Sequence, residues 1–294
     1  MAVTVLDGGM GRELDRVGAP FRQPEWSALT MFEAPEFVTQ VHESYVSAGA
    51  QVITTNAYAL VPFHIGDERF ASDGRRLASL AGRLAREVAE RHPGVRVAGC
   101  LPPVMGSYRP DLFTVDAARP LVTALVEEQA PFVDIWLAET QSSIAEVELV
   151  REVLDASGAT QPLWCSFTLT DSLDADGRAT LRSGESVTDA VQAASRLGAE
   201  VVSFNCSPPE VMEPAIVEAV GAVDLPVAVY ANAFVLNHGE GANESLSELR
   251  DDMIPAAYTA WADRWIAAGA SIVGGCCGVG ADHVSALSHH LATR

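Results

Sequence analysis

Eight short apolar runs alternate with longer segments of helical period along the chain. Most of these runs are nearly continuous stretches of apolar residues, which is typical of parallel strands that are covered on both faces. Strand followed by helix, repeated eight times, is the pattern of a (β/α)8 barrel. The expected strands are residues 3–7, 51–57, 95–100, 133–140, 163–169, 200–206, 227–232 and 270–277.

The 294 residues fit this α/β architecture as a single barrel domain, 1–294, with no linker inside it. A doubly wound parallel sheet is the alternative fold. Its nucleotide-binding form carries a G-x-G-x-x-G turn after the first strand, whereas this chain has only "GGMG" at 8–11. The pattern therefore favours the barrel. Among its long connections is the segment 170–186 after the fifth strand, and such loops carry specificity in barrels.

Charge and composition exclude several classes of function. The chain has 19 basic and 39 acidic residues, a net charge of −20, and such a surface repels nucleic acid and anionic membranes. It contains no lysine, which excludes Schiff-base and pyridoxal-phosphate chemistry. With neither a secretory signal nor an apolar stretch of about 20 residues, we expect a soluble, cytoplasmic protein that acts on small molecules.

Three of the five cysteines follow strands that end on the same rim of the expected barrel. Cys206 ends the sixth strand, and Cys276 and Cys277 end the eighth. Active sites of such barrels lie on this rim, and three thiolates suit a tetrahedral Zn²⁺ ion whose fourth position is open to a substrate. The alternative is that Cys206 is a small buried apolar residue and the pair is incidental or forms a vicinal disulfide. Cys100 and Cys165 lie within strands and are expected in the core.

Several motifs occur in the order found in a known enzyme family. In these motifs the chain resembles the zinc-dependent homocysteine S-methyltransferases over essentially its whole length. The resemblance implies a barrel that holds zinc through Cys206, Cys276 and Cys277. The motifs are "LDGGMGREL", "WSALTMFEAPEFVTQVHESYVSAGAQVITTNAY", "LAETQSSIAEVE", "FNC" and "GGCCG".

The chemistry that the resemblance implies is methyl transfer to homocysteine. A thiol bound to Zn²⁺ ionises at neutral pH and attacks an activated methyl group, which gives methionine. Asp7 and Glu139 match family acids that bind the substrate ammonium, and the amides of Gly8 and Gly9 are expected to receive its carboxylate. The alternatives are a solvated strand-end acid for Asp7 and a helix N-cap for Glu139.

The same resemblance assigns further residues to the site. Asn205 is expected to orient backbone or substrate, and Thr54 and Thr55 to support the floor. Tyr58 matches a tyrosine that approaches the metal when substrate is absent, and Trp26 an aromatic residue on the donor side, whose ring face stabilises an onium cation. Rim packing for Tyr58 and anchoring of the first loop for Trp26 are the alternatives.

The methyl donor is the least determined part of the function. Two rim segments depart from relatives that use S-methylmethionine: Cys100 and Pro102-Pro103 replace a glycine-rich turn, and Ala231 and Phe234 flank a retained Asn232. Because the chain has no room for folate and cobalamin modules, we expect a freely diffusing onium donor. S-methylmethionine ranks first, S-adenosylmethionine second, and betaine or a similar compound third.

Two other functions stay open on the sequence. The same zinc chemistry could act on another thiol acceptor, or the protein could bind zinc or thiols without turnover. The sequence specifies no oligomeric state.

Overall fold

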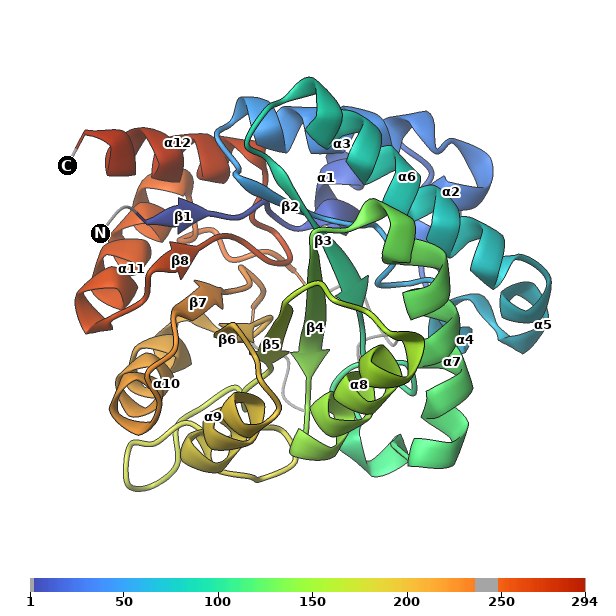
Figure 1. Ribbon diagram of the computed structural model, residues 1–294. Helices are drawn as coiled ribbons and strands as arrows, with labels where there is room; N and C mark the ends of the chain where they lie inside the picture. Colours follow the sequence, from blue (N-terminus) through green and yellow to red (C-terminus); the bar gives the residue numbers. More distant parts are fainter. Residues whose placement is uncertain (1–2, 236–247, 294) are drawn as a thin grey trace.

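Eight parallel strands form a closed barrel in the computed structural model of the chain, which describes residues 3–235 and 248–293 (Figure 1). The strand order is β1-β8-β7-β6-β5-β4-β3-β2, and a parallel bridge between Leu6 and Val52 joins the two ends. This closure confirms the (β/α)8 barrel and excludes the open doubly wound sheet. The strands are β1 Thr4–Val5, β2 Val52–Thr54, β3 Arg96–Leu101, β4 Ile135–Gln141, β5 Leu163–Phe167, β6 Val201–Asn205, β7 Val227–Tyr230 and β8 Ile272–Val273.

Helices surround the barrel in Figure 1. They bury their apolar faces against the outer side of the strands, in a continuous layer of side chains such as Leu77, Val150 and Ile216. The α-helices are α1 Met10–Arg16, α2 Ser27–Glu33, α3 Glu36–Ser47, α4 Pro62–Ile65, α5 Asp67–Arg69, α6 Arg75–Arg91, α7 Val115–Gln129, α8 Ile144–Ser157, α9 Val187–Arg196, α10 Pro209–Ala222, α11 Pro255–Ala268 and α12 Ala281–Ala292.

A second, smaller core fills the barrel interior. Ile135 and Leu137 of β4 pack there with Ala228 and Tyr230 of β7. Successive side chains of a strand point to opposite faces, so Glu139 follows Ile135 and Leu137 on the inward face. The alternation of side chains along β4 thus places the Glu139 carboxyl inside the barrel, at the end where the strands finish.

The connection from β4 to α8 has a complete helix-start motif. Ser143 is the N-cap of α8 and forms a capping box with Glu146, and the helix ends at Gly158 in the left-handed conformation, with φ of 70°. The N-cap alternative for Glu139 is therefore wrong, because Ser143 occupies that position.

The first and last strands are shorter than expected. The sequence predicts 3–7 and 270–277, but the ladder ends earlier because the chain leaves it to build the rim. The amide of Gly275 donates to the carbonyl of Asp7 over 2.9 Å, a contact beyond the regular pairing of β1 with β8. The cysteine pair consequently lies in a loop above β8 rather than in the strand.

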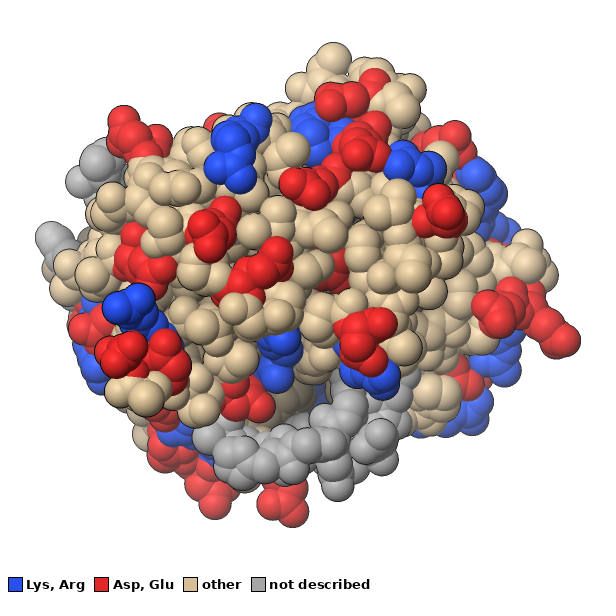
Figure 2. All heavy atoms as spheres, turned by 90° about the horizontal axis from the view of Figure 1, so that it is seen from below, with Lys and Arg blue, Asp and Glu red and all other residues tan. Residues whose placement is uncertain are grey.

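The surface carries the charge seen in the composition. Figure 2 shows acidic side chains spread over one face and interspersed with arginines. Many of the arginines are paired, as in the contacts of Arg75 with Glu127 and of Arg264 with Glu213. Within the described ranges, no helix has the length and apolar character required to span a bilayer.

Candidate active site

A cavity of about 220 Å³ opens at the carboxyl ends of the strands. The rim loops and the last inward residues of the strands form its walls, so residues far apart in the sequence meet there. Its lining includes all but one of the site residues expected from the sequence: Asp7, Gly8, Gly9, Trp26, Tyr58, Glu139, Cys206, Cys276 and Cys277.

Three cysteine side chains converge on one point of this cavity. The sulfurs of Cys206, Cys276 and Cys277 all lie within 4.8 Å of one another, and those of Cys206 and Cys277 are 3.9 Å apart. Sulfurs that bind one tetrahedral zinc at about 2.3 Å would be roughly 3.8 Å from each other. All three cysteines are free, so this structure contains no vicinal disulfide between Cys276 and Cys277.

The thiols also influence one another's ionisation. Hydrogen bonds from Cys276 and Cys277 hold the pKa of Cys206 well below its usual value. Because Cys276 and Cys277 donate these hydrogen bonds to Cys206, the pKa of each is raised well above its usual value. Without a cation, the cluster therefore favours one thiolate that accepts from two thiols.

The loop with the cysteine pair is held between two neighbouring strands. The Cys276 amide donates to the carbonyl of Ala231 over 3.0 Å, and the Ala233 amide donates to the carbonyl of Cys277 over 2.8 Å. On the other side lies Gly9, where a Cβ would come within 2.5 Å of the Cys276 carbonyl oxygen. Glycine at position 9 lets β1 approach the pair this closely.

Backbone strain concentrates around the cavity. Four non-glycine residues among those described have positive φ, and all four line it: Trp26 at 49°, Tyr108 at 63°, Thr140 at 60° and Cys206 at 49°. Such conformations cost about 1–3 kcal/mol each and persist where the surrounding structure holds them.

Two carboxyls face the same cavity, with Asp7 buried and Glu139 half-buried. Burial raises the pKa of Asp7 from 3.8 to about 8, and the charge of Glu139 adds to the rise, although Thr54 bonds Asp7 through its amide (2.6 Å) and hydroxyl (3.3 Å). Burial likewise raises the pKa of Glu139 from 4.5 to about 7. A nearby cation would lower both values. No basic residue in the described part of the chain offsets the rise in either pKa, and the burial of Asp7 corrects the alternative that it is a solvated acid.

The comparisons with known proteins agree with this geometry. The sequence model described as Homocysteine S-methyltransferase matches residues 4–291. The chain belongs to the homocysteine S-methyltransferase family.

Individual members of this enzyme family match over nearly their full length. Homocysteine S-methyltransferase 1 of Brassica oleracea var. italica is 26% identical, covering 99% of this chain and 94% of the relative. A selenocysteine Se-methyltransferase of the same plant is also 26% identical, covering 99% and 89%. The crystal structure of the Escherichia coli homocysteine methyltransferase MmuM in its metallated form has a TM-score of 0.78 and 27% identity, covering 99% and 96%.

The amides of Gly8 and Gly9 differ in availability. The Gly9 amide donates to the carbonyl of Val279 over 3.0 Å, so it is not free to receive a carboxylate as the sequence analysis expects. The Gly8 amide has no acceptor among the described residues. The expectation for Gly9 is therefore wrong in this structure, and its role is to pack against the cysteine loop.

Asn205 contacts backbone, which is the first of the two roles expected for it. It is fully buried and does not line the cavity. Its Oδ1 accepts from the Thr140 amide (3.0 Å) and the Ser166 hydroxyl (2.7 Å), and its Nδ2 donates to the Thr140 hydroxyl (2.7 Å). Asn205 thus fixes the strained backbone directly after Glu139.

The aromatic residues expected at the rim both face the cavity. The hydroxyl of Tyr58 shares a hydrogen bond with Ser107 over 2.8 Å. Trp26 is the N-cap residue of α2 and packs edge-on against Phe21, with ring centres 5.8 Å apart. Thr54 and Thr55 also line the cavity, and the buried hydroxyl of Thr55 donates to Oε1 of Gln129 over 2.5 Å.

Cys100 has a contact that the sequence analysis does not anticipate. It is buried, as expected, but its Sγ donates to Oε2 of Glu139 over 3.1 Å. The contact arises because β3 pairs with β4, which brings Cys100 beside the strand that carries Glu139. Cys165 is a buried core thiol, as expected.

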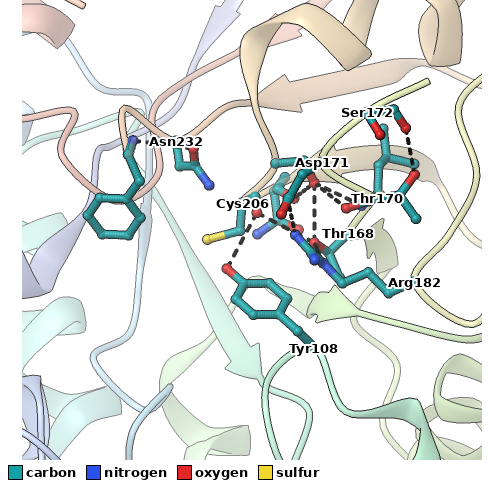
Figure 3. Close-up of polar contacts among 12 residues, drawn as sticks. Tyr108, Thr168, Thr170, Asp171, Ser172, Arg182, Cys206 and Asn232 are labelled. Atoms are coloured by element: carbon teal, nitrogen blue, oxygen red, sulfur yellow. Dashed lines mark hydrogen bonds and ion pairs between the residues drawn. The ribbon is translucent and has the colours of Figure 1, made fainter. Parts of the chain in front are cut away.

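Three further lining residues were not identified from the sequence. Tyr230 places a buried hydroxyl in the cavity with no hydrogen-bond partner among the described residues. Tyr108 and Arg182 lie on the side of Cys206, as Figure 3 shows. The available signal for Arg182 was the length of the segment 170–186.

Replacing Gly9 by Ala tests the close approach of β1 to the cysteine loop. The added Cβ would meet backbone rather than a flexible side chain, so we expect a loss of roughly 1–3 kcal/mol in unfolding free energy. Urea denaturation measures it. Gly221→Ala in α10 is the control, because its Cβ would meet nothing within 4 Å and stability should stay level or rise. Equal stability of both variants would contradict the packing.

The pH dependence of stability tests Asp7 and Glu139. Their raised pKa values mean that the folded protein holds protons which the unfolded chain releases above about pH 4. Their stabilising contribution is complete below that pH and is lost as pH rises through about 7 to 8. In metal-free protein, Glu139→Gln should flatten the fall in unfolding free energy between pH 5 and pH 8. Parallel curves for wild type and variant in urea titrations would show that Glu139 is ionised throughout.

Proposed function

We propose that this chain transfers a methyl group from a small onium donor to the thiol of homocysteine, giving methionine. The observation that carries the proposal is the meeting, in one cavity of a homocysteine S-methyltransferase family member, of three free thiols and two carboxyls. The thiols suit a soft cation, and the carboxyls suit the ammonium of an amino acid.

Zn²⁺ is the cation that fits the donor set. Three sulfurs from Cys206, Cys276 and Cys277, with spacings close to those of a tetrahedral site, leave one position for a substrate. When bound, zinc would ionise the homocysteine thiol at neutral pH and keep it nucleophilic. The related Escherichia coli MmuM structure is a metallated form, which supports a bound metal.

Asp7 and Glu139 would hold the amino group of homocysteine. The raised pKa values of these two carboxyls would fall when an ammonium lies between them, because an opposite charge favours the ionised form. The Gly8 amide is available for the carboxylate of the substrate. Thr54 would position Asp7 through its hydrogen bonds, and Asn205 would position Glu139 by holding the backbone of Thr140.

The transfer itself forms one bond and breaks one. The homocysteine sulfur, after its proton has left to solvent, bonds to the methyl carbon as the bond from that carbon to the donor's onium centre breaks. The electron pair of the broken bond stays on the donor. Trp26 would face the cation and Tyr58 would lie beside the thiols. A sulfonium is a better leaving group than a quaternary ammonium, so S-methylmethionine and S-adenosylmethionine rank above betaine.

One relative supports a second acceptor. The selenocysteine Se-methyltransferase matches nearly the whole chain at 26% identity, so an acceptor other than homocysteine is the alternative to assay first. Two carboxyls in the cavity beside the thiols argue against a protein that only binds zinc. We further propose that residues 1–294 form one homocysteine-binding domain that works in the cytoplasm on small molecules.

The metal assignment predicts that each cluster cysteine is required for zinc. Cys206→Ala and Cys277→Ser should each lose most of the roughly one zinc per chain that wild type retains, because two thiolates hold Zn²⁺ far less well than three. Metal analysis after purification without chelator measures this. Cys165→Ala, which removes a buried thiol outside the cluster, should keep its zinc. Unchanged zinc in the cluster variants would refute the assignment.

The ammonium assignment predicts weaker homocysteine binding in Asp7→Asn and Glu139→Gln at unchanged zinc content. Loss of a charge-assisted contact costs about 1.5–3 kcal/mol, so the dissociation constant should rise roughly tenfold or more. Binding of the product methionine, which has no thiol proton to lose, should also release fewer protons at pH 7 in Glu139→Gln than in wild type. Calorimetry in buffers of different ionisation enthalpy counts these protons.

Glu146→Gln is the matched control for this experiment. Glu146 is a buried carboxyl whose pKa burial also raises to about 7, but it lies outside the cavity, and Gln preserves the capping box. Its homocysteine affinity should equal that of wild type. An unchanged affinity in Asp7→Asn and Glu139→Gln, or a fall in their zinc content, would show that these acids have other roles.

A further inference from the structure

A second charged pair lines the cavity on a different side from Asp7. Nη2 of Arg182 contacts Oδ1 of Asp171 over 2.6 Å, and both side chains are partly exposed to the cavity, at 20% and 29%. Both residues belong to the connection between β5 and α9. In the strand order of the closed barrel, β5 is separated from β1 by three strands in either direction, so this pair lies opposite Asp7.

Arg182 is held in a defined position beside the thiols. Its guanidinium carbon lies 4.2 Å above the centre of the Tyr108 ring, and its Nε donates to the hydroxyl of Thr168 over 3.5 Å. The Tyr108 hydroxyl donates in turn to the carbonyl of Cys206 over 3.4 Å, as Figure 3 shows. Tyr108 therefore links the guanidinium to the backbone of Cys206, one residue of the cysteine cluster.

The segment that carries the pair is itself well ordered. Antiparallel bridges join Leu169 to Leu181 and Thr180 to Ser186, and the fully buried side chain of Leu181 anchors the residue before Arg182. The amide of Ser183 donates to the carbonyl of Ser142 over 3.1 Å. These contacts preorganise Arg182 before any ligand arrives.

The chemistry of the pair matches the head group of an amino acid. A guanidinium presents parallel N–H donors to a carboxylate, and among the described residues Nη1 of Arg182 has no acceptor. One oxygen of Asp171 bonds Arg182, which leaves the other for an ammonium. A cation beside an anion thus complements a zwitterion, whereas Asp7 and Glu139 offer negative charge alone.

We propose that Arg182 and Asp171 bind the α-carboxylate and α-ammonium of the methyl donor, which selects an amino-acid sulfonium such as S-methylmethionine. This inference rests on the proposed function. Two methylene groups separate the head group of S-methylmethionine from its sulfonium. This length suits a head group held at Arg182, on the other side of Tyr108 from Cys206. Betaine has a carboxylate, but its quaternary ammonium has no N–H to donate to Asp171, so it would use only half of the pair.

Steady-state kinetics of zinc-loaded variants test the role of Arg182. Arg182→Gln should raise KM for S-methylmethionine about tenfold or more, with a smaller change in kcat and with KM for homocysteine and zinc content unchanged. Arg182→Lys keeps the charge but loses the paired donors, so its KM for S-methylmethionine should lie between those of wild type and Arg182→Gln. The control is Arg178→Gln, an exposed residue of the same segment outside the cavity, which should leave all constants as in wild type.

Donor affinities measured by calorimetry without homocysteine test the separate roles of Arg182 and Asp171. Wild type should bind S-methylmethionine more tightly than dimethylsulfoniopropionate, which has the carboxylate but no ammonium. Asp171→Asn should remove most of that preference, and Arg182→Gln should weaken both ligands. Equal binding of the two compounds by wild type would overturn the role of Asp171.

Two outcomes separate this inference from the proposed function. If wild type forms methionine from S-methylmethionine but Arg182→Gln leaves the donor KM unchanged, or raises KM for homocysteine instead, the inference fails and the proposed function stands. If wild type forms methionine from betaine and from no sulfonium, the donor ranking of the proposed function fails, and this inference with it.

Discussion

The site depends on the hydrogen bonds that hold the Cys276–Cys277 loop between the ends of β7 and β1. Backbone groups of Ala231 and Ala233 bond it on one side, and Gly9 packs against it on the other. Because β8 is the strand between β1 and β7, closing the barrel also places the cysteine pair. Cys206 then meets the pair because β6 is the next strand beyond β7. A cation site is thus assembled from the same contacts that close the sheet.

The cavity separates two kinds of charge. At β1 and β4, the pKa values of Asp7 and Glu139 are raised, so both acids hold protons near neutral pH. At β5, Arg182 and Asp171 form a pair that is already neutral. Two amino acids with the same head group would consequently meet different surroundings on opposite sides of the thiols. Under the function proposed above, such asymmetry would orient two sulfur amino acids relative to each other.

Much of this arrangement could be predicted from the sequence, and the limits have physical reasons. Continuous apolar runs identified the strands, and the position of each cysteine after a strand placed all three on one rim. Glycine at position 9 was misassigned because an amide's availability depends on its partner, here Val279, which lies far along the chain. Arg182 was not identified because its position depends on the folding of a long connection, which no short-range pattern specifies.

The strained backbone around the cavity has a consequence for engineering this protein. Trp26, Tyr108, Thr140 and Cys206 adopt positive φ angles that glycine adopts with little strain. Substitutions that relax these positions would tend to increase thermostability while removing a side chain that lines the cavity. A selection for heat resistance that ignores activity would therefore gather mutations around the active site, and the positions it chose would outline the cavity independently of any assay.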